Sequence, residues 1–499
     1  MTSRRPSSAP VRCPSFAPGR SRWSGARRRT PGTAALLAVL LAAGTGCGVL
    51  PELVDRGDDS STGGFQPGAA GIGDPYFPTY GNGGYDVAGY QLTLRYDPDS
   101  ERLDGTATIT ATATTDLSRF NLDLAGLVVD AVTVDDTPAG HSRDGNELVV
   151  TPATGLADGT QFTVVVDYGG RPELLTSPDL GAGGFHVTDD GAIALGQPES
   201  ASTWFPVNDH PLDKATFDID VTVPDGLAAL SIGVPGPTSS ADGWTTWTWS
   251  ESTPLASYLT TLVIGDYRVE RGTHAGRPMV TAVSADLPEG GPAEQAMART
   301  GEIADYLESV FGPYPVDAYG GVVVNDDRIR YALETQSRPV YGDVFFDSGP
   351  VTWVVAHELA HQWFGNSVSI RHWRDMWLNE GFATYAEWLW SEHDGAATVD
   401  EMFDREYDRI DWASPAGDPG PAGIFSQSVY KRGGLTVHAL RLTIGDDAFF
   451  RLLRTWTAER RNGNASTEEF VTLAERVSGQ PLREFFDAWL YGDTAPAKP

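Results

Sequence analysis

Cysteine is almost absent from this chain: only Cys13 and Cys47 occur among its 499 residues. Cys13 lies in an N-terminal stretch that has the features of a removable leader, so no disulfide within the mature chain is predicted. A chain of this length does not need such cross-links, because it can bury apolar cores of ordinary size in two or three domains.

Basic residues are also scarce. The chain has 36 lysines and arginines against 67 acidic residues, which gives a net charge of −31. The arginines are unevenly placed, since residues 1–46 hold eight of them and contain no lysine and no acidic residue. The acidic remainder repels a phosphate backbone, so we expect no nucleic-acid partner. We interpret its charge as that of a soluble, self-repelling surface.

No apolar run is long enough to span a bilayer, and the N-terminal run Ala34–Ala43 has only ten residues. Several arginines precede this run and Gly46-Cys47 closely follows it, an order typical of an export signal. The small residue before Cys47 resembles a bacterial lipobox, although Gly44 stands where leucine is usual. We therefore expect a signal peptide over residues 1–46 and a lipid on Cys47. The chain would then be anchored to the outer face of the cytoplasmic membrane, or secreted if Cys47 carries no lipid.

Three stretches of different character follow the signal. Residues 47–80 are rich in Gly, Asp, Ser, Thr and Pro without periodicity, and are predicted to be a flexible linker. Residues 81–270 contain segments that alternate with period two, such as Tyr90–Tyr96, which favours an antiparallel β domain. Residues 271–499 begin with a few strands and become mainly helical, so the predicted fold class is α+β with two domains. Helical patterns occupy 293–311, 351–365, 377–392, 399–411, 430–443, 446–459 and 467–490.

One helical segment carries the pattern His-Glu-x-x-His. His357 and His361 are four residues apart, so both side chains lie on the same face of a helix and can bind one ion. Glu358 is rotated by about 100° from His357. It therefore lies beside the ion, where it can deprotonate a bound water. Valines and a leucine surround the motif and favour a buried helix.

A catalytic zinc site needs a third protein ligand and keeps one position open for water. Glu380 follows His361 after 18 intervening residues, in the segment Asn379-Glu380-Gly381. Bulky apolar residues flank it, including Trp377 and Tyr385, and they give this segment a face that can pack on the first helix. We therefore predict one zinc ion per chain, bound by His357, His361 and Glu380.

This pattern resembles the aminopeptidase N and leukotriene hydrolase family of gluzincin zinc peptidases. The resemblance covers about residues 85–495 and includes Trp204–Pro211 and Phe485–Leu490, which are similar to family segments. It implies that the second domain, residues 271–499, is a thermolysin-like peptidase domain. The chain ends soon after Leu490, so we expect a short form without the family's C-terminal helical domain.

The resemblance also implies further site residues. Tyr430 begins Tyr-Lys-Arg-Gly, which is similar to the family segment whose tyrosine steadies the oxyanion. Ala332 and Glu334 match a segment whose glutamate binds the substrate's free α-amino group, although Tyr331 departs from the pattern. Glu199 lies in Gln-Pro-Glu, which is similar to the segment that supplies a second carboxylate for this amine. Two carboxylates suit a partly desolvated ammonium group.

One further candidate comes from helix geometry alone. Glu387 is seven residues after Glu380 and therefore lies on the same face, two turns along the helix. From this position its carboxylate could accept a hydrogen bond from the second ring nitrogen of a ligating histidine. An ordinary surface glutamate at this position is an equally open interpretation.

Together these residues predict a zinc-dependent aminopeptidase, with Glu358 as the base and peptides with a free N-terminus as substrates. Three alternatives stay open. The first is an endopeptidase that cleaves longer peptides in an open cleft. The second is an epoxide hydrolase like the family's bifunctional member. The third is a non-catalytic surface lipoprotein that keeps the peptidase fold.

Overall fold

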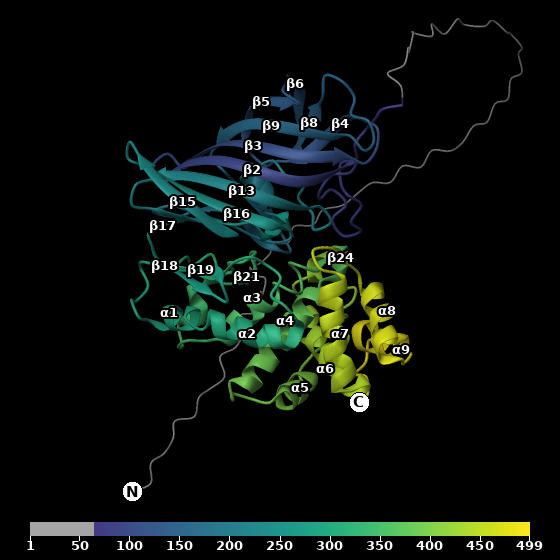
Figure 1. Ribbon diagram of the computed structural model, residues 1–499. Coiled ribbons are helices and arrows are strands. Elements are labelled where there is room, and N and C mark those ends of the chain that lie inside the picture. Colours follow the sequence, from purple (N-terminus) through teal and green to yellow (C-terminus); the bar gives the residue numbers. More distant parts are fainter. Residues whose placement is uncertain (1–63) are drawn as a thin grey trace, which may run out of the picture. The chain divides into compact units, whose positions relative to one another are not determined.

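A computed structural model describes residues 64–499 (Figure 1). The predicted signal peptide and Cys47 lie outside the described residues. Phe65–Pro499 form one compact unit, in which a β-rich part is followed by a mainly helical part. No helix among residues 64–499 combines the length and apolarity that crossing a bilayer requires.

An eight-stranded sheet forms the largest element of the β-rich part. In β2, Leu92, Leu94 and Tyr96 are buried while the residues between them are exposed, as the period-two pattern predicts. The sheet is antiparallel except where β13 pairs in parallel with β2. Its strands, in order, are β15 (Val234–Ala241), β16 (Trp244–Ala256), β13 (Lys214–Pro224), β2 (Tyr85–Asp97), β3 (Arg102–Ala113), β9 (Gln161–Gly170), β5 (Val128–Val134) and β6 (Thr137–Pro138).

Two smaller sheets complete the β-rich part. The first contains β1 (Gln66–Pro67), β4 (Leu117–Asp123), β8 (Glu147–Thr151) and β7 (Gly140–Asp144), in that order. The second contains β10 (Leu174–Ser177), β11 (Gly181–Val187), β12 (Ala192–Leu195), β17 (Leu262–Gly265) and β14 (Ala228–Leu230). The loop that follows β12 carries Glu199.

The helical part begins with a five-stranded sheet of β18 (Tyr267–His274), β19 (Arg277–Ser284), β20 (Tyr319–Val324), β22 (Val340–Gly342) and β21 (Ala332–Leu333). Strand β21 forms one edge of this sheet. The helices are α1 (Pro292–Met297), α2 (Thr300–Phe311), α3 (Trp353–Ala360), α4 (Trp377–His393), α5 (Val399–Tyr407), α6 (Gly433–Ile444), α7 (Asp446–Glu459), α8 (Thr467–Ser478) and α9 (Arg483–Phe486). The remaining strands β23 (Ser369–Ile370) and β24 (Asn464–Ala465) pair in parallel.

Two boundaries differ from those expected. The expected domain boundary at residue 270 falls inside β18, because that strand pairs with β19 in the five-stranded sheet that begins the helical part. The expected linker, residues 47–80, is structured where it is described: β1 pairs with β4, and Asp74 is buried. Composition suggested a flexible tether, but the Asp74 carboxylate finds partners that lie far away in the sequence.

Lys214 of β13 connects the β-rich part to the loop that follows α3. Its ammonium group donates hydrogen bonds to the carbonyl oxygens of Asn366, at 2.8 Å, and Ser367, at 3.0 Å. The side-chain amide of Asn366 in turn donates to the backbone carbonyl of Glu334, at 2.8 Å. These bonds fix the segment of Glu334 relative to the helix that carries the histidines.

Candidate metal centre

Helix α3 carries His357 and Glu358 near its C-terminal end, and His361 is the residue that directly follows it. Val355 and Leu359 of this helix are fully buried, so the apolar residues around the motif hold it inside the protein. All three polar side chains are buried as well, with His357 only 7% exposed. Burial makes these groups depend on one another, or on a bound ion, for neutralisation.

Helix α4 packs on α3 and brings Glu380 to the two histidines. The Oε2 atom of Glu380 lies 3.2 Å from Nε2 of His357 and 3.5 Å from Nε2 of His361. Donor atoms around a tetrahedral zinc ion are roughly 3.3 Å apart, given bonds of about 2.0–2.2 Å. The three groups predicted to bind zinc therefore converge with the spacing that the ion needs.

The second ring nitrogen of each histidine has a partner. Nδ1 of His357 lies 2.7 Å from a carboxylate oxygen of Glu387, and Nδ1 of His361 lies 2.9 Å from the backbone carbonyl oxygen of Phe364. When Nδ1 carries the proton and donates to these oxygens, Nε2 is left with its lone pair toward Glu380. The contact that helix geometry suggested for Glu387 is thus present.

Glu358 and Glu334 form a second cluster with His361. One carboxylate oxygen of each and a ring nitrogen of His361 all lie within 4.8 Å of one another. Burial raises the pKa of Glu358 to about 8, although the two histidines oppose this. Burial also raises the pKa of Glu334. A carboxyl group with such a raised pKa is suited to taking up a proton from water.

The charges of these groups fit a divalent cation. Four buried carboxylates surround two imidazoles: those of Glu334, Glu358, Glu380 and Glu387. Lys431 lies 3.5 Å from Glu387 but cannot offset all four. Two imidazoles and one carboxylate are a typical ligand set of catalytic zinc, and a bound ion lowers the pKa of nearby acids.

Tyr430 reaches the centre from η6 (Ser428–Arg432), which contacts α4. Its ring is nearly parallel to that of His357, with centroids 6.0 Å apart. Burial raises the pKa of the Tyr430 hydroxyl well above its usual value, and the nearby carboxylates of Glu380 and Glu334 raise it further. Tyr430 therefore keeps its proton and can donate it in a hydrogen bond to negative charge that develops beside the metal ligands.

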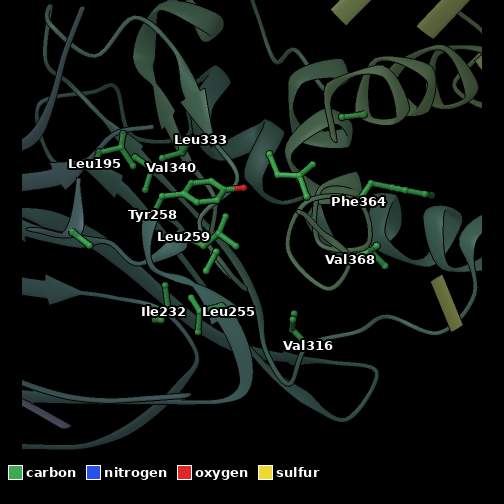
Figure 2. Packing of buried hydrophobic residues seen from close by; sticks show 14 of the residues in the cluster. Leu195, Ile232, Leu255, Tyr258, Leu259, Val316, Leu333, Val340, Phe364 and Val368 are labelled. Atoms are coloured by element: carbon green, nitrogen blue, oxygen red, sulfur yellow. The ribbon is translucent and has the colours of Figure 1, made fainter. Parts of the chain in front are cut away.

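Glu334 follows edge strand β21, which contains Ala332. The Tyr258 hydroxyl donates to the Glu334 carboxylate at 3.0 Å, and the Gln197 amide donates to the same oxygen at 3.4 Å. In Figure 2 the Tyr258 hydroxyl points away from the apolar side chains around Leu333 and Val340. Sequence reasoning missed Tyr258, since nothing in its local sequence marks it.

Glu199 lies two residues after Gln197 and is partly buried. Burial raises the pKa of the Glu199 carboxyl group to about 8. Within residues 64–499 no hydrogen bond or ion pair joins Glu199 to Glu334. The structure thus brings Gln197 to Glu334 directly, and Glu199 lies two residues further along the same loop.

Comparison with known proteins assigns the chain to a family. The Peptidase M1 N-terminal domain model matches residues 87–259, and the Peptidase family M1 domain model matches residues 300–489. The M1 zinc metallopeptidase from Deinococcus radiodurans is 32% identical, with a TM-score of 0.78, over 86% of this chain and 98% of that chain. The chain belongs to peptidase family M1.

Other relatives of this M1 chain show the same similarity. A two-domain M1 zinc metallopeptidase bound to L-arginine is 31% identical over 86% of this chain and 99% of that chain, with a TM-score of 0.79. Human glutamyl aminopeptidase is 29% identical over 59% of this chain. Rice aminopeptidase M1-C is 26% identical over 80% of it. The matches span 33% and 49% of the lengths of these two proteins.

These matches confirm three predictions: the family, the β domain followed by a helical catalytic domain, and zinc as the cofactor. The individual roles of the site residues stay predictions, which the geometry above makes specific.

Proposed function

We propose that this M1 chain is a zinc-dependent aminopeptidase that releases residues from the free N-terminus of peptides. The observation that carries the proposal is the position of Glu334. Its carboxylate is buried beside both Glu358 and the metal ligand His361. A substrate ammonium group bound at Glu334 would therefore place the first peptide bond next to the proposed base.

His357, His361 and Glu380 would bind the zinc ion. When bound, zinc acts as a Lewis acid that makes water nucleophilic near neutral pH and polarises a carbonyl group. Glu358 accepts the proton of the attacking water and passes it to the leaving amine. Tyr430 donates a hydrogen bond to the carbonyl oxygen as negative charge develops there.

Substrate orientation depends on two further features. Strand β21 is the last strand of its sheet, where a peptide backbone would pair with it at Ala332. Glu334 and Glu199 would bind the α-amino group, and Tyr258 and Gln197 fix the Glu334 carboxylate in position. An N-terminal residue bound in this way leaves only one peptide bond in reach of Glu358.

Mass spectrometry of products tests the proposal. The zinc-loaded protein is incubated with an unblocked peptide of ten residues, and products are followed over time. We expect single residues to be lost in order from the N-terminus. Internal fragments at the first time point would contradict the proposal and favour endopeptidase action. A Glu358→Gln variant that binds zinc and yet shows no cleavage is the matched control, because it keeps the volume of the side chain.

We also propose that the chain is exported and attached to a membrane through Cys47. This rests on the sequence alone, namely the arginine-rich start, the short apolar run and the small residue before Cys47. Mass spectrometry of the mature N-terminus tests it. A chain that begins at Cys47 with a diacylglyceryl group is expected, and an unmodified Cys47 thiol in the mature protein would contradict it.

A further inference from the structure

The turn that follows α3, residues 364–368, begins at Phe364 (Figure 2) and contacts two parts of the candidate site. The backbone carbonyl oxygen of Phe364 lies 2.9 Å from Nδ1 of His361. Two residues later, the side-chain amide of Asn366 donates a hydrogen bond to the backbone carbonyl of Glu334 at 2.8 Å. One short turn therefore contacts both a predicted zinc ligand and the residue proposed to bind the substrate's amine.

This turn is held from the β-rich part by Lys214, the first residue of β13. The half-buried ammonium group donates hydrogen bonds to the carbonyl oxygens of Asn366, at 2.8 Å, and Ser367, at 3.0 Å. Within residues 64–499 no carboxylate forms an ion pair with this lysine, in contrast to the other two lysines of the chain. The two carbonyl oxygens of the turn therefore stabilise the positive charge of Lys214.

The same end of the strand pair β13–β16 also reaches the side chain of Glu334. Lys214 is paired with Ala256, the last residue of β16. Two residues further along the chain, the Tyr258 hydroxyl donates to the Glu334 carboxylate at 3.0 Å. One strand end thus holds the turn through Lys214 and the carboxylate through Tyr258.

The main chain of Glu334 is fixed by two amide donors. The side-chain amides of Asn366, at 2.8 Å, and Gln362, at 3.3 Å, both donate to its backbone carbonyl oxygen. The shorter bond comes from the residue whose own carbonyl oxygen is bound by Lys214. Loss of the Lys214 ammonium group therefore weakens one of two main-chain contacts, so its effect should be partial.

We propose that Lys214 is a positioning residue that sets the place of Glu334 relative to the zinc site, acting through the turn of residues 364–368. This inference rests on the proposed function. An aminopeptidase has to hold the substrate's amine at a fixed distance from the reacting carbonyl group, and a misplacement of about 1 Å can cost a large part of the rate. Because the turn contacts both His361 and Glu334, a donor that fixes the turn also fixes this distance.

A lysine with a merely structural role makes a different prediction. Its loss would lower the melting temperature or the zinc content, and any loss of activity would persist after the Glu334 carboxylate had been removed. A lysine that positions Glu334 lowers kcat/KM only while that carboxylate is present to bind the amine.

The test compares zinc-loaded proteins on one aminoacyl substrate: the wild type, Lys214→Met, Asn366→Ala, Glu334→Gln and the double variant of Lys214→Met with Glu334→Gln. Methionine keeps the apolar stem of the lysine and removes its donors. Lys498→Met is the matched control, because that lysine pairs with Asp404 of α5 and does not bond to the turn. Zinc content and melting temperature are measured for each protein. The wild type is also compared on free and N-acetylated forms of one peptide, which tests the proposed function separately.

We expect Lys214→Met and Asn366→Ala each to lower kcat/KM about tenfold with zinc still bound, as the loss of one hydrogen bond in a positioning network does. Lys498→Met should behave as the wild type. In the Glu334→Gln background, Lys214→Met should change kcat/KM by less than about twofold.

The inference is overturned if Lys214→Met keeps the kcat/KM of the wild type, or if its full effect persists in the Glu334→Gln background. If Lys214→Met does not fold or bind zinc, Asn366→Ala decides: an unchanged kcat/KM, or the same failure to bind zinc, overturns the inference. A wild type that cleaves free and acetylated peptides equally contradicts the proposed function. A wild type that prefers the free amine, with no effect of Lys214→Met, contradicts the inference alone.

Discussion

The bond between Glu387 and His357 yields a prediction with a defined magnitude. Glu387 is 8% exposed, and its carboxylate lies 2.7 Å from Nδ1 of His357. The contact is therefore a charge-assisted hydrogen bond between buried groups. Such bonds contribute about 1.5–3 kcal/mol. Replacing Glu387 with glutamine keeps an acceptor oxygen but removes the charge that makes the imidazole a stronger ligand.

We expect Glu387→Gln to bind zinc about 10- to 100-fold more weakly, the range measured when partners of metal ligands are removed. Part of this effect comes from Lys431, which loses its ion pair with Glu387 at 3.5 Å. The change corresponds to about 1.4–2.7 kcal/mol of binding free energy. Because of this weaker binding, Glu387→Gln should lose its activity faster than the wild type in the presence of a competing chelator. The activity should return when excess zinc is added.

The assay is competition for zinc with a chromophoric chelator at fixed pH. Glu392→Gln is the control, since it removes an exposed carboxylate from the same helix and keeps an acceptor for the backbone amide of Val399. If Glu387→Gln and Glu392→Gln both bind zinc within about twofold of the wild type, the account of how His357 is oriented is refuted.

Three further changes have expected outcomes. Tyr430→Phe should keep its zinc and its fold but lose kcat by about 100-fold or more, since one oxyanion donor is removed; steady-state kinetics measure this. Gly433→Ala should lower the free energy of unfolding by about 1–3 kcal/mol in urea titrations, because its methyl group would lie 2.8 Å from Cα of Gly381. Asp74 has a pKa of about 2, since burial, which would raise it, is outweighed by hydrogen bonds from His210 and backbone amides. The ionised Asp74 carboxylate therefore stabilises the fold by about 2 kcal/mol above about pH 4, and this contribution is lost as the pH falls toward 2. Asp74→Asn should flatten that part of the acid unfolding curve.

The positions of the candidate site residues within each helix could be predicted from sequence because they depend on local periodicity. His357 and His361 are one helical turn apart, and Glu380 and Glu387 are two turns apart, so a helix places each pair on one face whatever surrounds it.

Other features depend on contacts between distant residues, which no local pattern encodes. The bond from the Trp373 backbone amide to Asp74 forms only because the segment before β2 folds back along the catalytic part. Its composition, rich in glycine and proline, indicated a linker instead. The parallel pairing of β13 with β2 was missed for the same reason, since alternation predicts a strand but not its neighbour.

The central claim is that a carboxylate beside the zinc site selects a free N-terminus. It is tested most directly by the ratio of kcat/KM for one peptide with a free and with an acetylated N-terminus, measured for the wild type and for Glu334→Gln. The account predicts a large preference for the free amine in the wild type, which shrinks by about tenfold or more in the variant. Equal kcat/KM values for the two peptides in the wild type would contradict it.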